Sequence, residues 1–106
     1  MEATMKVRIL QLDDDDPRIF RDYAFVERNE GFSAEGYSAV YETQHYATDT
    51  LDDLFQIYNE SQPEGYHGHS LSVSDIVEIT RPGGQLERWF CDAIGWRNVT
   101  GKGGET

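Results

Sequence analysis

Residues 65–79 of this chain run Gly65-Tyr66-His67-Gly68-His69-Ser70-Leu71-Ser72-Val73-Ser74-Asp75-Ile76-Val77-Glu78-Ile79. In an unbroken strand over residues 70–79, alternate side chains share a face, so Asp75 would be buried beside Val77 and Ile79. An unpaired buried carboxylate is costly, and the sequence therefore favours an interruption between Ser72 and Asp75. Short Ser and Asp side chains in such a segment bond neighbouring backbone amides in a turn. We predict that a strand begins at Ile76, with Val77 and Ile79 facing the core.

Three more strands are predicted around this segment. The run Arg81-Pro82-Gly83-Gly84 predicts a hairpin turn, with positive φ at its second corner, between strands over residues 76–81 and 86–92. Alternating basic and apolar residues predict a strand over residues 5–12, in which Leu10 and Leu12 reach toward a second apolar surface. Four adjacent aspartates and Pro17 end that strand. Residues 37–46 are predicted as a strand in which Ala39 and Tyr41 face away from Val40.

Two helices are predicted from the spacing of apolar residues. Residues 19–29 show helical spacing, with Gly31 as a C-terminal signal. In residues 51–60, Thr50 is a good N-cap and Asp53 completes a weak capping box. The second helix carries an apolar stripe of Leu51, Leu54, Phe55 and Tyr58. Together these elements predict an α+β fold, an antiparallel β-sheet of about four strands with two α-helices packed on one face.

The length of the chain, 106 residues, predicts a single domain over residues 1–100, followed by a flexible tail over residues 101–106. The lone cysteine, Cys91, excludes an internal disulfide and favours a reducing cytoplasm. The N-terminal residues lack the features of a signal peptide, and no apolar run is long enough to span a membrane. We therefore expect a cytoplasmic protein that does not interact with membranes.

Negative charge dominates the composition. Twenty acidic residues against nine basic ones give a formal net charge of −11, and no Lys or Arg occurs between Asn29 and Thr80. Such a surface repels phosphates, so direct nucleic-acid binding is not expected. It attracts basic protein surfaces, including the phosphate-binding channels of nucleic-acid enzymes, whereas the alternative is that the acids serve solubility. The residues predicted to contact a partner are Asp13, Asp14, Asp15, Asp16, Glu42, Asp49, Asp52, Asp53, Glu60, Glu64, Tyr66 and His69.

Motifs for catalysis or metal binding are weak. His67 and His69 could both ligate a metal from an extended segment, with Asp75, Glu64 or His45 as a third ligand, but their spacing is no zinc signature. The aspartates at 13–16 lack the glycine and the terminal glutamate of a calcium loop. No Gly-x-Ser-x-Gly elbow or phosphate-binding glycine loop occurs. We expect no cofactor, no bound metal and no enzymatic activity.

The central segment also carries a family resemblance. Gly68-His69-Ser70-Leu71-Ser72-Val73-Ser74-Asp75, followed by the hairpin turn, an aromatic-rich strand and Asp92 ahead of Gly95-Trp96, resembles the YodL-like domain. The resemblance covers most of the chain. Relatives often have Val-Asp-Ser-Gly-Phe where this chain has Cys91-Asp92-Ala93-Ile94-Gly95-Trp96, one residue longer. The family offers no agreed catalytic residues to carry over to this chain.

What the resemblance implies is a setting in bacterial mobile elements, conjugative transposons and phages, often near antirestriction genes. It implies a counter-defence inhibitor that binds a basic surface of a CRISPR effector or a restriction enzyme. One alternative is an interaction module for a host cytoskeletal or replication protein, in which exposed aromatics and the Gly65–Asp75 loop make the contact. A second alternative is a metal-dependent enzyme that uses His67, His69 and Asp75. The oligomeric state is not predicted.

Overall fold

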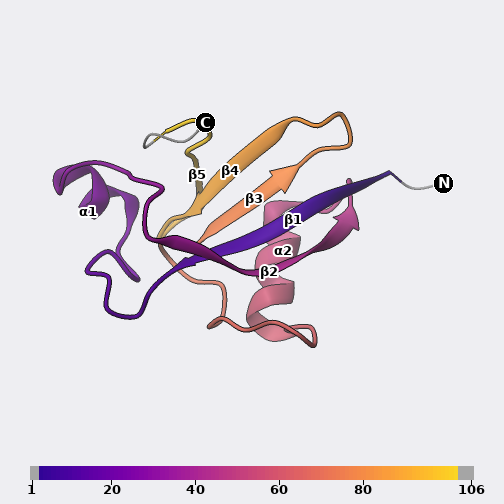
Figure 1. Ribbon diagram of the computed structural model, residues 1–106, viewed down its shortest axis with the longest axis horizontal. Coiled ribbons are helices and arrows are strands. Elements are labelled where there is room, and N and C mark those ends of the chain that lie inside the picture. Colours follow the sequence, from indigo (N-terminus) through magenta and orange to yellow (C-terminus); the bar gives the residue numbers. More distant parts are fainter. Residues whose placement is uncertain (1–2, 103–106) are drawn as a thin grey trace.

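Five strands form one antiparallel sheet in the computed structural model, which describes residues 3–102 (Figure 1). The elements are β1 (Thr4–Leu12), α1 (Tyr23–Arg28), β2 (Tyr37–Tyr46), α2 (Leu51–Glu60), β3 (Ile76–Thr80), β4 (Leu86–Cys91) and β5 (Trp96–Asn98). The strands lie in the order β2-β1-β3-β4-β5, so the first strand of the chain occupies an interior position. The predicted α+β class is confirmed, with one strand more than the four expected.

One face of the sheet packs against α2. Antiparallel pairing aligns Ile9 with Val77 and Val77 with Trp89, so these three side chains share a face. Leu54 and Tyr58 of α2 are buried in the same cluster. The predicted strand boundary at Ile76 is confirmed, and Val77 and Ile79 are buried on this face as expected.

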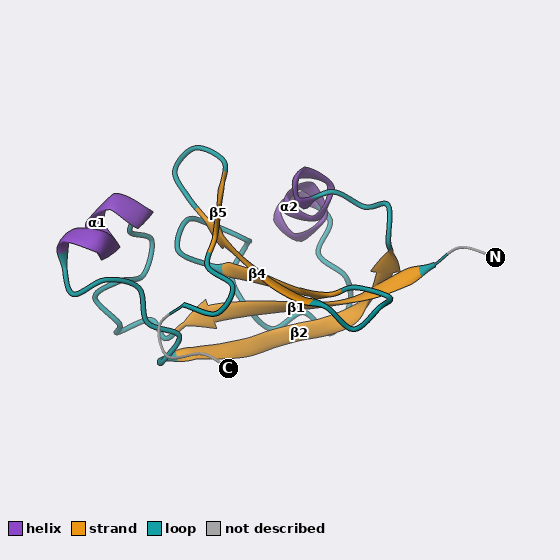
Figure 2. Cartoon of the chain, turned by 90° about the horizontal axis from the view of Figure 1, so that it is seen from above, coloured by secondary structure: helices purple, strands orange, loops and turns teal. Residues whose placement is uncertain are grey.

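Side chains that alternate to the other side of the strands pack against α1 at the end of the sheet, and Figure 2 shows α1 and α2 on the same side of the strands, as expected. Leu10 pairs with Ile76, and Ile76 with Phe90, and these side chains form a cluster with Tyr23 and Val26 of α1. Figure 2 shows β5 rising between the two helices. The cause is strand alternation: Leu10 points away from Ile9 and needs an apolar cover of its own.

Strand β2 contains a bulge that the regular alternation did not predict. Ile9 pairs with Tyr41, but Leu10 pairs with Ala39, which leaves Val40 as the extra residue. Val40 and Tyr41 consequently both pack against the cluster beneath α2, although alternation would place them on opposite faces.

The helix ends follow local capping. The Thr50 hydroxyl accepts from the Asp53 amide, and the Asp53 carboxylate accepts from the Thr50 amide, so the capping box at α2 is confirmed. Helix α1 is shorter than predicted, because residues 16–21 form turns and the Asp22 side chain caps the helix by accepting from the Phe25 amide. Phe55 was predicted in the core, but it is 37% exposed and packs edge-on against Trp96.

The turn between β3 and β4 and the C-terminal residues can be compared with their predictions. The predicted turn joins β3 and β4, and the positive φ falls on Gly84 rather than on Gly83. Of the predicted tail, Gly101 and Lys102 are exposed, while residues 103–106 lie outside the described residues. Within residues 3–102, the structure contains no helix that is both long and apolar enough to cross a membrane.

Candidate functional site

The outward face of α2 is acidic. Helical spacing turns Leu54 and Tyr58 inward and leaves Asp52, Asp53 and Glu60 exposed. Hydrogen bonds from the backbone and side chain of Thr50 lower the pKa of Asp53, which therefore stays ionised at neutral pH. A shallow hollow of about 430 Å³ runs along this face, and its lining includes Asp49, Asp53, Gln56, Ile57, Glu60 and Ser61.

Arginines neutralise acidic groups elsewhere in the molecule. Arg18 pairs with Asp16 at 2.8 Å, Arg81 with Glu87 at 3.0 Å and Arg97 with Asp92 at 3.2 Å. Among the described residues, arginine ion pairs reach Asp16, Glu42, Glu78, Glu87 and Asp92, none of which lies on α2. The α2 face thus keeps its negative charge.

The four aspartates after β1 divide into two roles. Asp13, Asp14 and Asp15 are exposed, as a contact surface requires. The carboxylate of Asp16 is held by Arg18, whose hydrogen bonds lower the pKa of Asp16. Arg18 also donates to the backbone carbonyls of residues 33 and 35, so this pair ties the loop to the segment before β2.

Gln11 joins the Gly65–Asp75 segment to the sheet. Its Nε2 donates to the carbonyl of His69 at 2.9 Å, and its Oε1 accepts from the amide of His69 at 3.2 Å. The two bonds reproduce the donor and acceptor pattern of a neighbouring strand. A Cβ at position 68 would lie 2.1 Å from Gln11 Oε1 and 2.8 Å from a methyl carbon of Val40, so a residue larger than Gly68 would displace the Gln11 side chain.

Asp75 is fully buried in this network. Its Oδ2 accepts from the Ser72 amide at 2.8 Å and from Gln11 Nε2 at 3.1 Å, and it lies 3.7 Å from His69 Nδ1. Burial raises the pKa of the Asp75 carboxyl to about 7, against the lowering effects of Ser72, His69 and Gln11. Oδ1 has no hydrogen-bond partner among the described residues. The predicted turn through Ser72 is confirmed, and the carboxylate that it positions is buried rather than solvated.

A comparison with protein-family models identifies the family of the chain. The family model for the YodL-like domain matches residues 6–101. The chain belongs to the YodL-like domain family. The comparison with curated proteins found no match, and the comparison with solved structures found none either.

In this YodL-like domain, the remaining predicted contact residues differ in accessibility. Glu42 and Glu64 are exposed, and Asp49 is partly buried beside His45 at 3.1 Å. Tyr66 stacks on Tyr58 and donates to the carbonyl of His69, and burial raises the pKa of its hydroxyl to about 12. Tyr66 and His69 therefore contribute to the internal packing of the segment.

The three residues of the metal hypothesis do not meet at one point. His67 and His69 both line a hollow of about 340 Å³ with Asp13 and Asp14, whereas Asp75 lies in the interior, 3.7 Å from Nδ1 of His69. Nδ1 of His69 lies 2.8 Å from the Ser70 carbonyl, a contact that occupies this nitrogen when it carries the proton. Among residues 3–102, no group of three or more His, Cys, Asp or Glu residues is placed to hold a metal ion.

Two residues with central roles in this YodL-like domain were not predicted from the sequence. Gln11 follows Val7 and Ile9 at strand spacing, and a polar residue at a core-facing position was the available signal. His45 was considered as a third metal ligand, but its side chain is 12% exposed and hydrogen-bonds the hydroxyl of Tyr58. No spacing in the sequence indicates that contact, because it joins β2 to α2.

Proposed function

We propose that this YodL-like protein is a non-catalytic counter-defence inhibitor of a bacterial mobile element or phage. In this proposal the acidic face of α2 binds the basic nucleic-acid-binding surface of a host CRISPR effector or restriction enzyme, and stands in for the phosphates of DNA. The site of action is the cytoplasm, in keeping with the single cysteine.

The observation that supports the proposal is the uncompensated charge on α2. Asp52, Asp53 and Glu60 are exposed on one helix, and the lining of the hollow along this face includes the carboxylates of Asp49, Asp53 and Glu60. Charge complementarity of this kind increases association rates and discriminates against acidic partners. The exposed aspartates at 13–15 supply a second anionic region.

The test is nuclease inhibition under increasing salt. Cleavage by several CRISPR effectors and restriction enzymes is measured with excess protein at about 50 and 200 mM salt, a range in which screening weakens contacts between exposed charges. We expect inhibition of at least one enzyme, weaker at the higher salt. Unchanged cleavage by every enzyme at both salt concentrations contradicts the proposal.

Charge variants locate the contact. The double variant Asp52→Asn, Glu60→Gln removes two charges from α2 and leaves the capping residues in place. The matched control, Glu27→Gln with Glu30→Gln, removes the same net charge from exposed positions at α1. We expect only the α2 variant to lose inhibition, because a solubility role depends on net charge rather than on its position.

A further set of substitutions distinguishes the counter-defence proposal from the alternative of an interaction module for a host protein. Replacing Asp13, Asp14 and Asp15 by Asn leaves the Asp16–Arg18 pair intact. An interaction module that binds through the Gly65–Asp75 loop retains its binding after this exchange and loses it in a Tyr66 variant. The counter-defence proposal predicts weaker binding after the aspartate exchange.

A further inference from the structure

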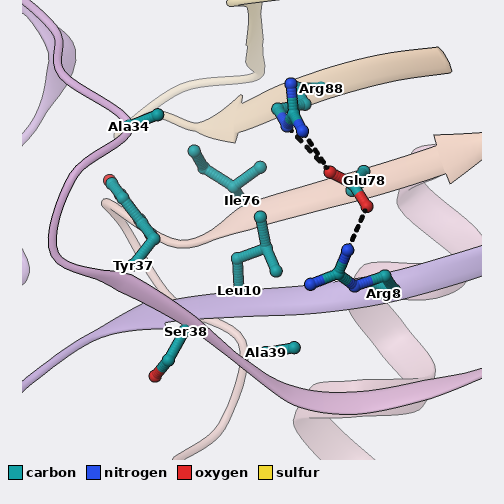
Figure 3. Close-up of a pocket in the computed structure, with 9 residues that line it drawn as sticks. All are labelled: Arg8, Leu10, Ala34, Tyr37, Ser38, Ala39, Ile76, Glu78 and Arg88. Atoms are coloured by element: carbon teal, nitrogen blue, oxygen red, sulfur yellow. Dashed lines mark hydrogen bonds and ion pairs between the residues drawn. The ribbon is translucent and has the colours of Figure 1, made fainter. Parts of the chain in front are cut away.

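A cleft opens on the face of the sheet opposite α2. Figure 3 shows Leu10 and Ile76 at its centre, Tyr37 and Ala39 toward β2, and Arg8 and Arg88 at the other end. The cleft encloses about 180 Å³, room for a small group rather than for a drug-sized ligand.

The charged end of the cleft is built from one row across the sheet. Arg8 on β1 pairs with Glu78 on β3, and Glu78 pairs with Arg88 on β4. Glu78 is 4% exposed, and its two oxygens are shared between the arginines: Oε1 lies 3.1 Å from Arg8 Nη1, and Oε2 lies 2.7 Å from Arg88 Nη2. The three side chains together carry one net positive charge, held in a fixed geometry by a buried carboxylate.

Arg8 is the accessible member of this row. Its side chain is 35% exposed, against 11% for Arg88. Figure 3 shows its guanidinium directed toward Leu10, the apolar centre of the cleft. Nε of Arg8 is buried without a hydrogen-bond partner among the described residues, and the exposed carboxylate of Glu42 stays 3.6 Å from it. A buried donor that lacks an acceptor is unfavourable, so this end of the cleft favours an incoming acceptor.

We propose that this cleft binds a carboxylate carried on a short apolar stem. The carboxylate of the ligand bonds to the guanidinium of Arg8, where it competes with the carboxylate of Glu42. The apolar stem packs on Leu10, Ile76 and Ala39. Guanidinium recognises carboxylate through paired, charge-assisted hydrogen bonds, and preorganisation by Glu78 limits the entropy lost on binding. The site is separate from the acidic face of α2 and does not depend on the proposed inhibition.

The ligand chemistry has two sources, a free short-chain acid and the C-terminal carboxylate of an apolar residue. Isovalerate represents the first and the peptide Gly-Gly-Val the second, with isovaleramide and Gly-Gly-Val-amide as uncharged counterparts. Binding is followed by amide chemical shifts in two-dimensional NMR spectra of the intact protein. We expect saturable shifts at residues 8–10, 39 and 76 with at least one carboxylate, and none with its amide. The acid that saturates at the lower concentration identifies the source.

Variants test the role of each wall of the cleft. Arg8→Gln should weaken binding about tenfold or more, as loss of a charge-assisted hydrogen bond requires. Lys6→Gln is the control, because Lys6 lies two residues away on the same face of β1 and does not line the cleft. Ala39→Leu fills the apolar end without touching the charges and should also abolish binding. Glu42→Gln removes the competing carboxylate and should tighten binding.

Several results would overturn the carboxylate site. Absence of saturable shifts with both acids overturns it, as does equal binding of the amides. Equal binding by Arg8→Gln and by Lys6→Gln also overturns it. If Arg8→Gln fails to fold, Ala39→Leu and Glu42→Gln carry the test, and the proposal fails if neither changes the affinity. The α2 variant Asp52→Asn, Glu60→Gln should bind the acids as the parent does, whatever its effect on nuclease inhibition.

Discussion

Replacement of Asp75 by asparagine should change the pH dependence of stability. Asp75 is fully buried, and its pKa rises from 3.8 to about 7 in the folded protein. The folded state therefore favours the protonated acid. As pH rises from about 4 to about 7, the unfolded chain gains stability by ionising Asp75 while the folded protein holds the proton, so the free energy of unfolding falls.

The magnitude follows from the two pKa values. A rise from 3.8 to about 7 is about 3 units, and each unit corresponds to about 1.4 kcal/mol, so ionisation of Asp75 costs up to about 4 kcal/mol above pH 7. Asparagine keeps an oxygen to accept from Ser72 and Gln11 and carries no charge. Its amide group occupies the place of the unpartnered Oδ1, which costs about 1–3 kcal/mol. We expect Asp75→Asn to be more stable than the parent at pH 8, with its advantage shrinking toward pH 5.

Urea unfolding at pH 5, 6, 7 and 8, followed by tryptophan fluorescence, measures this difference. The quantity of interest is the parent-to-variant difference at each pH, since every titratable group other than residue 75 is the same in both proteins. Glu27→Gln serves as a control, because Glu27 is exposed on α1 and should leave the pH profile unchanged. A difference between the parent and Asp75→Asn that stays constant from pH 5 to pH 8 would refute the reasoning.

Three further predictions concern packing. Leu54 of α2 is fully buried, so Leu54→Ala should cost about 2–5 kcal/mol by urea unfolding, and a melting temperature within a degree or two of the parent would show that the stripe is not core. Gly68→Ala should lower the free energy of unfolding, because the added methyl group displaces the Gln11 side chain. The double variant Gly68→Ala, Gln11→Ala should lose less free energy of unfolding than the sum of the two single variants. Additive losses would exclude a contact between positions 68 and 11. Burial raises the pKa of Cys91 to about 12, so its thiol should react with a disulfide reagent only in urea, and rapid reaction in the native protein would contradict its burial.

The helix caps, the strand boundary and the hairpin turn were predictable from the sequence because each depends on neighbours along the chain. Thr50 and Asp53 cap α2 through bonds that span three residues, and proline with glycine sets the turn after β3. The alternation of Val7 and Ile9 with polar residues located β1 in the same way. The acidic character of α2 also follows from sequence, because helical spacing alone turns Asp52 outward while Leu54 faces the core.

The tertiary structure decided which elements meet. Periodicity assigns a side chain to a face but not to a neighbour, so the interior position of β1 and the packing of α1 in the cluster of Leu10 were not predictable. Gln11 and His69 are 58 residues apart, and their hydrogen bonds form only when the sheet brings them together. Asp75 is tolerated in the interior for the same reason. A local turn supplies one of its partners, Ser72, but the other is the side chain of Gln11, 64 residues away on another strand.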